Sequence, residues 1–454
     1  IFTNTKRVWR MHTRGDYWVL DLPSGRLTQL GGEAEPSTLM FAKFSPDNQS
    51  VAYVRQNNIY VEEISSGVIS QLTHDGNEHC INGTSDWAYE EEFKLRDGFC
   101  WSPNGNHIAY WQFDTTGIET FYMINNTDSL YPQLIPLPYP KVGTTNAACR
   151  VGVIGATGGH TTWFAVPGDP RQHYIPRMEW AASSEQVAIQ QLNRLQNQNK
   201  VMLGNVADGT IQVILTENDA AGVDLHDDLK WLNDGSAFTW VSDRDGWRHL
   251  YRVSRDGQEI TLLTPGEYDV ISVEKIDDAG GWVYFIASPE NATQRYLYRV
   301  RLDGGHFDKL KAGRAQRLSP TGQPGSHSYQ LSPQANWAFH TYATFDSPPI
   351  VSLISLPEHK PVRVLEANDT LQTHVTALNP SPTEFFQVKI EEGVILDGWC
   401  IKPPDFDPAK QYLLLFYLYG EPANVTVVDR WGGQRHLYHL LLAQQGFVVM
   451  SLDN

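Results

Sequence analysis

The chain has few cysteines, no excess of basic residues and no long hydrophobic run, and each absence excludes a class of protein. A membrane-spanning helix needs about 18–20 consecutive apolar residues. The longest apolar runs of this 454-residue chain are residues 413–419 and 447–452, each suited to one buried strand. No secretory signal pattern is visible. Because the chain begins with Ile1 in what reads as a structured segment, we expect that an upstream segment has been removed.

The four cysteines are too sparse for a disulfide scaffold. They are Cys80, Cys100, Cys149 and Cys400, without a Cys-x-x-Cys pair. No cluster of cysteine and histidine has the spacing of zinc ligands. We therefore expect no metal site, no cofactor and unpaired thiols, with a Cys80–Cys100 bridge as the alternative.

Acidic residues outnumber basic ones, 52 to 35, which gives a formal net charge of −17. Nucleic-acid binding needs a basic surface, so this charge argues against such a partner, and it also disfavours an anionic membrane surface. The charge is compatible with a cationic ligand, although acidity also favours solubility. Hydrophobic residues make up 41% of the chain, enough for a sizeable core, and its 14 Trp, 20 Tyr and 18 Phe favour β-sheet.

A pattern with a period of about 50–60 residues recurs along most of the chain. An aromatic or apolar residue precedes a Ser-Pro-Asp/Asn-Gly-like turn and an alternating strand, at 44–54, 101–111, 231–240 and 331–339, and more weakly at 179–189 and 281–285. The next strand ends in a Ser-Gly or Asp-Gly pair, a hairpin signal, at 24–25, 256–257 and 303–304. Four short strands per repeat predict a β-propeller, with a longer insertion around residues 125–175. An array of β-sandwiches is the alternative.

The propeller pattern ends near residues 380–382, so we assign residues 1–382 to the propeller and residues 383–454 to a second domain. The second segment predicts a hairpin, a strand, a helix closed by a glycine and a further strand, at 385–401, 412–417, 434–446 and 447–452. Strand, helix and strand in this order are typical of the opening of an α/β sheet. We expect this sheet to be truncated at Asn454.

The segment Asp86–Phe93 (DWAYEEEF) places three consecutive carboxylates after two aromatic residues. Carboxylates held against an aromatic surface lose part of their hydration and attract a cation, such as the amino end of a peptide. Adjacent carboxylates also raise each other's pKa unless a cation neutralises them. A solvated acidic patch or the start of a helix is the alternative. Against it, Trp87 and Tyr89 are costly to expose.

These residues resemble the dipeptidyl peptidase IV family of serine peptidases, in which an eight-bladed propeller is joined to an α/β-hydrolase domain. Asp86–Glu92 matches the family motif Asp-Trp-x-Tyr-Glu-Glu-Glu, and residues 138–146 (PYPKVGTTN) match a second family stretch. Three shorter stretches are also similar to family segments: Trp9-Arg10, 419–422 (YGEP) and 451–454 (SLDN). The likeness covers nearly the whole chain.

The resemblance implies roles for individual side chains. Glu91 and Glu92 would bind the ammonium group of the substrate's N-terminus, and Glu90 would be structural. Arg10 would contact a substrate carbonyl next to the scissile bond. Tyr419 would donate its hydroxyl to the oxyanion.

The rest of the family's catalytic machinery is expected outside the chain. No Gly-x-Ser-x-Gly elbow is present, and the family's catalytic Ser, Asp and His lie beyond Asn454. His340 and His374 are read as ordinary blade or surface residues. Glu421 departs from the family pattern, which has glycine at that position of the Tyr419 loop. We expect the chain alone to be inactive.

The resemblance implies a serine exopeptidase that releases dipeptides from peptides with a free N-terminus, after Pro or Ala. It also implies a periplasmic or secreted location, and homodimers are common among relatives. The alternative is a non-catalytic propeller that binds peptide or protein partners. Endo-acting prolyl oligopeptidases and acylaminoacyl peptidases share the architecture but lack the pair of glutamates, so the acidic motif counts against them.

Overall fold

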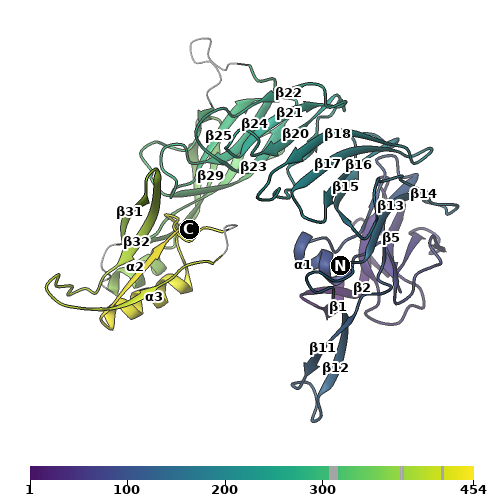
Figure 1. The fold of residues 1–454 in the computed structure, drawn as a ribbon, viewed down its shortest axis with the longest axis horizontal. Coiled ribbons are helices and arrows are strands. Elements are labelled where there is room, and N and C mark those ends of the chain that lie inside the picture. Colours follow the sequence, from purple (N-terminus) through teal and green to yellow (C-terminus); the bar gives the residue numbers. More distant parts are fainter. Residues whose placement is uncertain (306–314, 379, 381–382, 421–423, 454) are drawn as a thin grey trace. The chain divides into compact units, whose positions relative to one another are not determined.

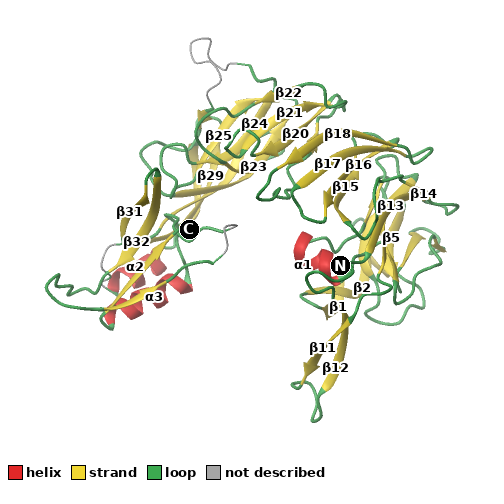
Figure 2. Ribbon diagram, viewed as in Figure 1, coloured by secondary structure: helices red, strands yellow, loops and turns green. Residues whose placement is uncertain are grey.

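Antiparallel β-sheets make up most of the structure, and helices are few and short (Figure 2). The structure is a computed structural model that describes residues 1–305, 315–378, 380, 383–420 and 424–453. The described residues form two compact units. The first contains Ile1–Asp227, Trp231–Phe238 and Ser254–Glu259, and the second contains Asp228–Lys230, Thr239–Val253 and Ile260–Asn454. No helix among the described residues has the length and apolar character to cross a membrane.

Up to residue 218 the strands form a series of antiparallel sheets (Figure 1). The first sheet contains β1 (Phe2–Val8), β2 (Met11–Asp21) and β3 (Arg26–Gln29). The second contains β4 (Met40–Phe44), β5 (Ser50–Arg55), β6 (Asn58–Glu63) and β7 (Ile69–Gln71). The third has the order β14-β13-β10-β8, with β9 paired to β10, and contains β8 (Cys80–Asn82), β9 (Phe99–Trp101), β10 (His107–Asp114), β13 (Ala148–Gly155) and β14 (Thr162–Trp163). The fourth contains β15 (His173–Trp180), β16 (Gln186–Asn193), β17 (Gln198–Asn205) and β18 (Ile211–Asn218).

Further four-stranded sheets follow, each built from strands in chain order. One contains β19 (Lys230–Trp231), β20 (Ala237–Ser242), β21 (His249–Ser254) and β22 (Ile260–Leu262). The next contains β23 (Val270–Asp277), β24 (Trp282–Ala287), β25 (Tyr296–Arg301) and β26 (Gln316–Arg317). Another contains β27 (Ser326–Leu331), β28 (Trp337–Thr344), β29 (Ser347–Ser355) and β30 (Lys360–Glu366). Such consecutive four-stranded sheets are consistent with the predicted propeller blades.

The central strands explain why the repeats read as apolar runs. Every residue of β20 is buried, and six of the eight residues of β10 and of β16 are buried on both faces. A strand covered on one face alone would alternate between apolar and polar residues. The sheets of each unit therefore pack face to face, and the predicted strands at 51–54, 108–111, 187–189 and 237–240 are confirmed.

The Ser-Pro turns of the repeats share one hydrogen-bond pattern. The backbone N–H of His107 donates to Ser102 Oγ at 3.0 Å, and Ser102 Oγ donates to Asn104 Oδ1 at 2.8 Å. The same bond from the residue five positions later recurs at Ser45 (3.0 Å) and Ser332 (3.1 Å). The serine satisfies a donor at the strand start, which explains its recurrence in the sequence.

The last sheet has a different topology, in the order β31-β32-β34-β33. Its strands are β31 (Glu384–Glu391), β32 (Val394–Ile401), β33 (Leu413–Phe416) and β34 (Phe447–Leu452), and the helices of this region are α2 (Asp369–Ala377) and α3 (Gln434–Gln444). β33 and β34 are parallel, with α3 between them in the chain, as predicted. Gly446 follows α3 with a φ of 89°, a conformation that favours glycine at a helix end. The predicted domain boundary at residue 382 lies outside the described residues.

The insertion after β10 contains a two-stranded ribbon, β11 (Thr120–Asn125) and β12 (Gln133–Pro138). In Figure 1 this ribbon runs away from the other sheets of the first unit. It exposes apolar side chains on both faces, with Tyr122 and Ile124 at 58% and 67% on one face and Phe121 and Ile135 at 45% and 40% on the other.

The acidic motif forms the helix α1 (Trp87–Phe93), with Glu90 in its first turn. Asp86 caps the helix, because its Oδ1 accepts the N–H of Tyr89 at 3.0 Å. Lys94, at a φ of 56°, ends it in the left-handed conformation. On the inner face, Tyr89 is buried against Phe113 and Phe93. The aromatic residues of the motif thus anchor the carboxylates to the core.

The buried cap makes the stability of the protein depend on pH. Burial raises the pKa of Asp86 to about 6, although the Tyr89 N–H and the charge of Arg96 oppose that shift. The folded state therefore binds this proton more tightly than the unfolded chain, whose aspartates titrate near ~3.9. The contribution is full below pH ~4 and is lost as pH rises through about 6, by at most roughly 3 kcal/mol.

We predict that Asp86→Asn, which keeps the acceptor oxygen, abolishes this contribution. The difference in urea midpoint, wild type minus variant, should decrease as the pH is raised from 4 to 7. Exposed Asp224→Asn serves as the control, and its difference from the wild type should stay constant over the same range. A pH-independent difference for Asp86→Asn would contradict the prediction.

Candidate functional site

An ion pair joins the β1–β2 hairpin to helix α1. Val8 pairs with Met11, so Trp9 and Arg10 form the two-residue tip of the hairpin. Arg10 Nη2 donates to Glu91 Oε1 at 2.6 Å, and Arg10 Nε donates to the other carboxylate oxygen. The Glu91 side chain is 20% exposed and that of Arg10 is 69% exposed. A two-pronged pair of this kind fixes both the distance and the orientation of the carboxylate.

Glu90, the first of the three consecutive glutamates, points into the protein. Glu90 Oε2 lies 3.1 Å from Arg96 Nε, and the two side chains are only 7% and 11% exposed. Arg96 Nη1 also donates to Thr84 Oγ1 at 2.9 Å and to the carbonyl of Ser85 at 2.8 Å. Burial raises the pKa of Glu90 and lowers that of Arg96 to about 10, and the mutual attraction of the two charges opposes both shifts. Glu90 is therefore placed to hold the helix rather than a ligand.

Glu92, the last of the three consecutive glutamates, is exposed to solvent. Glu92 is the next residue along α1, and successive side chains of a helix point about 100° apart. Among the described residues, none forms an ion pair with Glu92. The helix thus directs its three carboxylates to a buried arginine, to the hairpin and to solvent.

The hairpin tip is held on α1 by a second contact. The guanidinium of Arg96 lies 4.4 Å from the ring centroid of Trp9, a cation–π arrangement. Trp9 has a φ of 54°, an uncommon backbone conformation for a bulky residue. Such a conformation persists where surrounding contacts compensate its cost, so the Trp9–Arg96 contact is part of what positions Arg10.

The second family-like stretch lies beside the first. The rings of Trp87 and Tyr139 are 4.4 Å apart, and Tyr139 also packs on Phe121 at the start of the ribbon. Asn146, at the end of that stretch, donates to the Tyr174 hydroxyl at 2.9 Å. Aromatic contacts therefore connect α1 with the segment around residues 138–146.

This arrangement can bind a small cation. Glu91 and Glu92 carry two negative charges at one end of α1, and Arg10 neutralises one of them. A carboxylate has about four acceptor positions, so Glu91 can accept a further hydrogen bond beside those from Arg10. A primary ammonium group, with three donors, matches this acceptor set.

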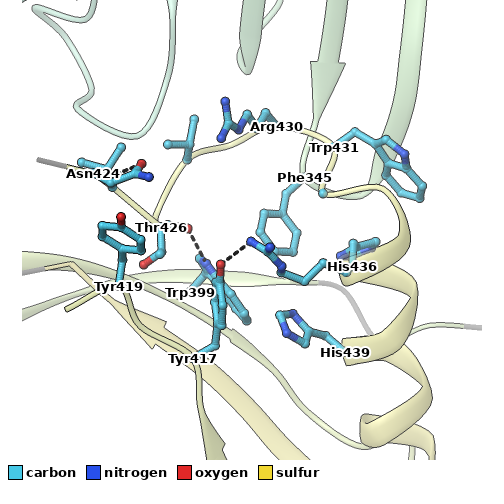
Figure 3. A pocket seen from close by; sticks show the side chains of 14 residues that line it. Phe345, Trp399, Tyr417, Tyr419, Asn424, Thr426, Arg430, Trp431, His436 and His439 are labelled. Atoms are coloured by element: carbon cyan, nitrogen blue, oxygen red, sulfur yellow. Dashed lines mark hydrogen bonds between the residues drawn. The ribbon is translucent and has the colours of Figure 1, made fainter. Parts of the chain in front are cut away.

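Tyr419 lies in the second unit, where it lines a cavity of about 490 Å³. The side chain is 39% exposed, in the segment that follows β33. Figure 3 shows it facing the same space as Asn424, Thr426 and Arg430. Glu421, which departs from the family pattern, lies outside the described residues.

Aromatic and basic side chains build the wall of this cavity. Trp399 Nε1 donates to the carbonyl of Thr426 at 3.1 Å, and Arg435 donates to the Tyr417 hydroxyl (Figure 3). Burial lowers the pKa of His439 to about 4, and the nearby positive charges of His436 and Arg435 act in the same direction. The histidine is therefore neutral at pH 7, and the wall of the cavity presents hydrogen-bond donors without a carboxylate among its described lining residues.

The structure brings together Arg10 and Glu91, two of the four residues singled out from the sequence. Glu92 occupies the next helical position, and Tyr419 belongs to the other compact unit. Sequence reasoning missed Arg96, because nothing in its local pattern distinguishes a buried arginine from a surface one. The four cysteines are unpaired, as expected. His340 is a buried blade residue of β28, and His374 is exposed on α2.

Comparison with known proteins gives the family. The model of the dipeptidyl peptidase IV (DPP IV) N-terminal region matches residues 1–349. The chain is 29% identical to the probable dipeptidyl-aminopeptidase B of Emericella nidulans over 482 residues, covering 100% of the chain and 52% of that relative. It is 28% identical to dipeptidyl peptidase 4 of Trichophyton rubrum, over 94% of the chain and 56% of the relative. The chain thus spans about half the length of these relatives.

Solved structures agree. The crystal structure of Porphyromonas gingivalis dipeptidyl peptidase 4 is similar with a TM-score of 0.90 and 28% identity, over 100% of this chain and 62% of that one. A putative dipeptidyl aminopeptidase IV from Bacteroides ovatus, at 22% identity and a TM-score of 0.78, shares the fold. On the match to its N-terminal region, which covers residues 1–349, the chain belongs to the dipeptidyl peptidase IV family.

Proposed function

We propose that this chain is the substrate-gripping part of a serine dipeptidyl peptidase, which releases dipeptides from peptides with a free N-terminus. The observation that carries the proposal is the Arg10–Glu91 pair at the exposed end of α1, next to Glu92. Relatives that match the whole chain or nearly all of it are named as dipeptidyl peptidases, which supports the same activity. A preference for Pro or Ala at the second substrate residue is proposed by family resemblance.

In this proposal the guanidinium of Arg10 binds Glu91 in the absence of substrate, at the carboxylate that the substrate's ammonium group would bind. Arg10 keeps the Glu91 carboxylate oriented, because its two N–H donors bind both carboxylate oxygens. The incoming ammonium group then binds Glu91 and Glu92. Arg10 is released in part to donate to a carbonyl of the substrate backbone. By family resemblance, cleavage is proposed to fall after the second residue of the peptide.

The second unit contributes Tyr419 to this proposal. Its hydroxyl would donate a hydrogen bond to the oxyanion that forms when the scissile carbonyl is attacked. The cavity that Tyr419 lines offers further donors, including Asn424 and Arg430. The catalytic Ser, Asp and His are proposed to lie in the part of the relatives that extends beyond this chain.

The domain plan and assembly belong to the same proposal. We assign residues 1–382 to an eight-bladed propeller and residues 383–454 to the opening of an α/β-hydrolase domain, which the parallel β33–β34 pair supports. The exposed apolar ribbon β11–β12 supports a homodimer, since such surfaces mark protein contacts. A periplasmic or secreted location stays a proposal.

The first test is the double substitution Glu91→Gln with Glu92→Gln in the full-length enzyme. Two charge-assisted hydrogen bonds of roughly 1.5–3 kcal/mol each would be weakened, so kcat/KM for free-amine dipeptidyl substrates should fall about 100-fold or more. Glu33→Gln with Glu35→Gln removes the same charge from exposed positions of the same unit and should leave kcat/KM unchanged. Activity within about twofold of the wild type would disprove the ammonium grip.

Arg10→Ala should raise KM about 10-fold or more and leave the thermal transition of the protein intact. The reason is that a 69% exposed side chain contributes little to folding, whereas its contact with the substrate carbonyl is lost. Steady-state kinetics and a thermal melt measure the two effects, with exposed Arg26→Ala as the control. A collapsed melting transition would mark Arg10 as structural instead.

Tyr419→Phe should lower kcat about 100- to 1,000-fold with little change in KM, since the lost hydrogen bond forms only in the transition state. Tyr438→Phe, on the exposed side of α3, removes a hydroxyl from the same unit and should have no effect. Unchanged kcat in Tyr419→Phe would remove this residue from the mechanism. If the wild-type protein binds free-amine peptides and never hydrolyses them, the non-catalytic alternative holds.

A further inference from the structure

Three histidines that belong to no common sequence motif lie close together in the sheet β27–β30. His327 and Tyr329 lie two residues apart on β27 and so share one face of the strand. His340 on β28 is directly opposite Tyr329 in the antiparallel register. His359 lies in the turn between β29 and β30. The three imidazoles are 2%, 6% and 9% exposed, so the cluster is buried.

The hydrogen bonds of the cluster define which nitrogens carry lone pairs. His327 Nε2 lies 3.0 Å from the carbonyl oxygen of Gln323, which can only accept, so Nε2 carries the hydrogen. In the neutral ring, Nδ1 of His327 then has the lone pair, and it accepts from His340 Nε2 at 2.9 Å. A carbonyl that fixes the ring of a histidine in this way is the usual outer partner of a metal ligand.

A second chain of hydrogen bonds leads to the third imidazole. The N–H of Leu297 donates to Ser319 Oγ at 2.8 Å, which leaves the serine hydroxyl able to donate to the Tyr329 oxygen, 2.7 Å away. In that arrangement the Tyr329 hydroxyl donates to His359 Nε2 at 2.9 Å. In the corresponding tautomer of His359, Nε2 carries a lone pair.

We propose that His327, His340 and His359 bind one divalent transition-metal ion of the zinc class. Imidazole nitrogen is a preferred ligand of Zn²⁺, Cu²⁺ and Ni²⁺. The ligand atoms of the three histidines lie within 4.8 Å of one another. For the ion to bind, His340 must take the tautomer with its hydrogen on Nδ1, which leaves Nε2 free as a ligand. The Tyr329 hydroxyl keeps its hydrogen and turns it away from His359 Nε2, which leaves that nitrogen to the ion.

Binding of the ion requires the three imidazoles to rotate toward a common centre. Zn–N bonds of ~2.0–2.1 Å place tetrahedral ligand atoms roughly 3.3 Å apart. The His327–His340 pair, at 2.9 Å, opens slightly, and His359 moves inward. The neighbouring positive charge of Arg317 is paired with Glu290 Oε2 at 2.6 Å, which reduces its repulsion of the ion. The ion would join two strands and a turn of one sheet, which makes the site structural.

The test is metal content in matched variants of the purified full-length protein. The protein is stripped with EDTA, equilibrated with Zn²⁺, freed of unbound metal and measured by mass spectrometry. The wild type should retain one more Zn²⁺ per chain than His340→Gln or His359→Gln. His374→Gln, exposed on α2, makes the same substitution outside the cluster and should retain the wild-type amount. Zn²⁺ should also raise the melting temperature of the wild type and not that of His359→Gln.

Equal zinc content in the wild type and the cluster variants would overturn the proposal, as would a wild type that retains none. His359 lies in a turn, so His359→Gln is the variant expected to fold if His340→Gln does not, and circular dichroism checks both. Anomalous scattering at the zinc edge from wild-type crystals provides a readout independent of any variant. A peak between the three imidazoles supports the site, and a peak elsewhere alone overturns it.

Discussion

The attraction between Arg10 and Glu91 connects parts of the chain that are 81 residues apart. Without a cation from the hairpin, the Glu91 carboxylate would have no ion-pair partner among the described residues. With it, the helix keeps charge at its exposed end while its aromatic face stays in the core. The orientation of the Glu91 carboxylate depends on this pair, and the Trp9–Arg96 contact helps to hold the hairpin tip in place.

The three glutamates of the motif differ in burial: Glu90 is buried, whereas Glu91 and Glu92 are accessible to solvent. Glu90 and Arg96 are removed from water and lie within ion-pair distance of each other, and removing either partner would leave a buried charge uncompensated. Glu91 and Glu92 remain near solvent, where exchanging one cation for another costs little. In the proposed function, a peptide amine competes for Glu91 without disturbing the buried pair. The aromatic contacts of Trp87, Tyr89 and Tyr139 provide the rigid base for that exchange.

Much of the architecture could be predicted from the sequence because turns and strands leave local patterns. The Ser-Pro turns, the strands that follow them and the elements at 384–452 are found where glycine, serine and apolar residues indicated. Resemblance to a family directed attention to Arg10 and Glu91, and the structure shows them paired. The pairing of Glu90 with Arg96 and the meeting of His327 with His359 could not be predicted, since they depend on strand register and sheet packing. No spacing along the chain encodes such contacts.

The shortness of α1 has a consequence for how this motif can vary. The three acidic positions face three directions only because each residue turns the helix by about 100°. Exchanging one side chain alters one direction, whereas adding or deleting a residue between Asp86 and Lys94 would rotate every later side chain and send a carboxylate into the core. Natural variation in this segment should therefore preserve its length more strictly than its composition. Engineered insertions that aim to retune binding belong in the flanking loops.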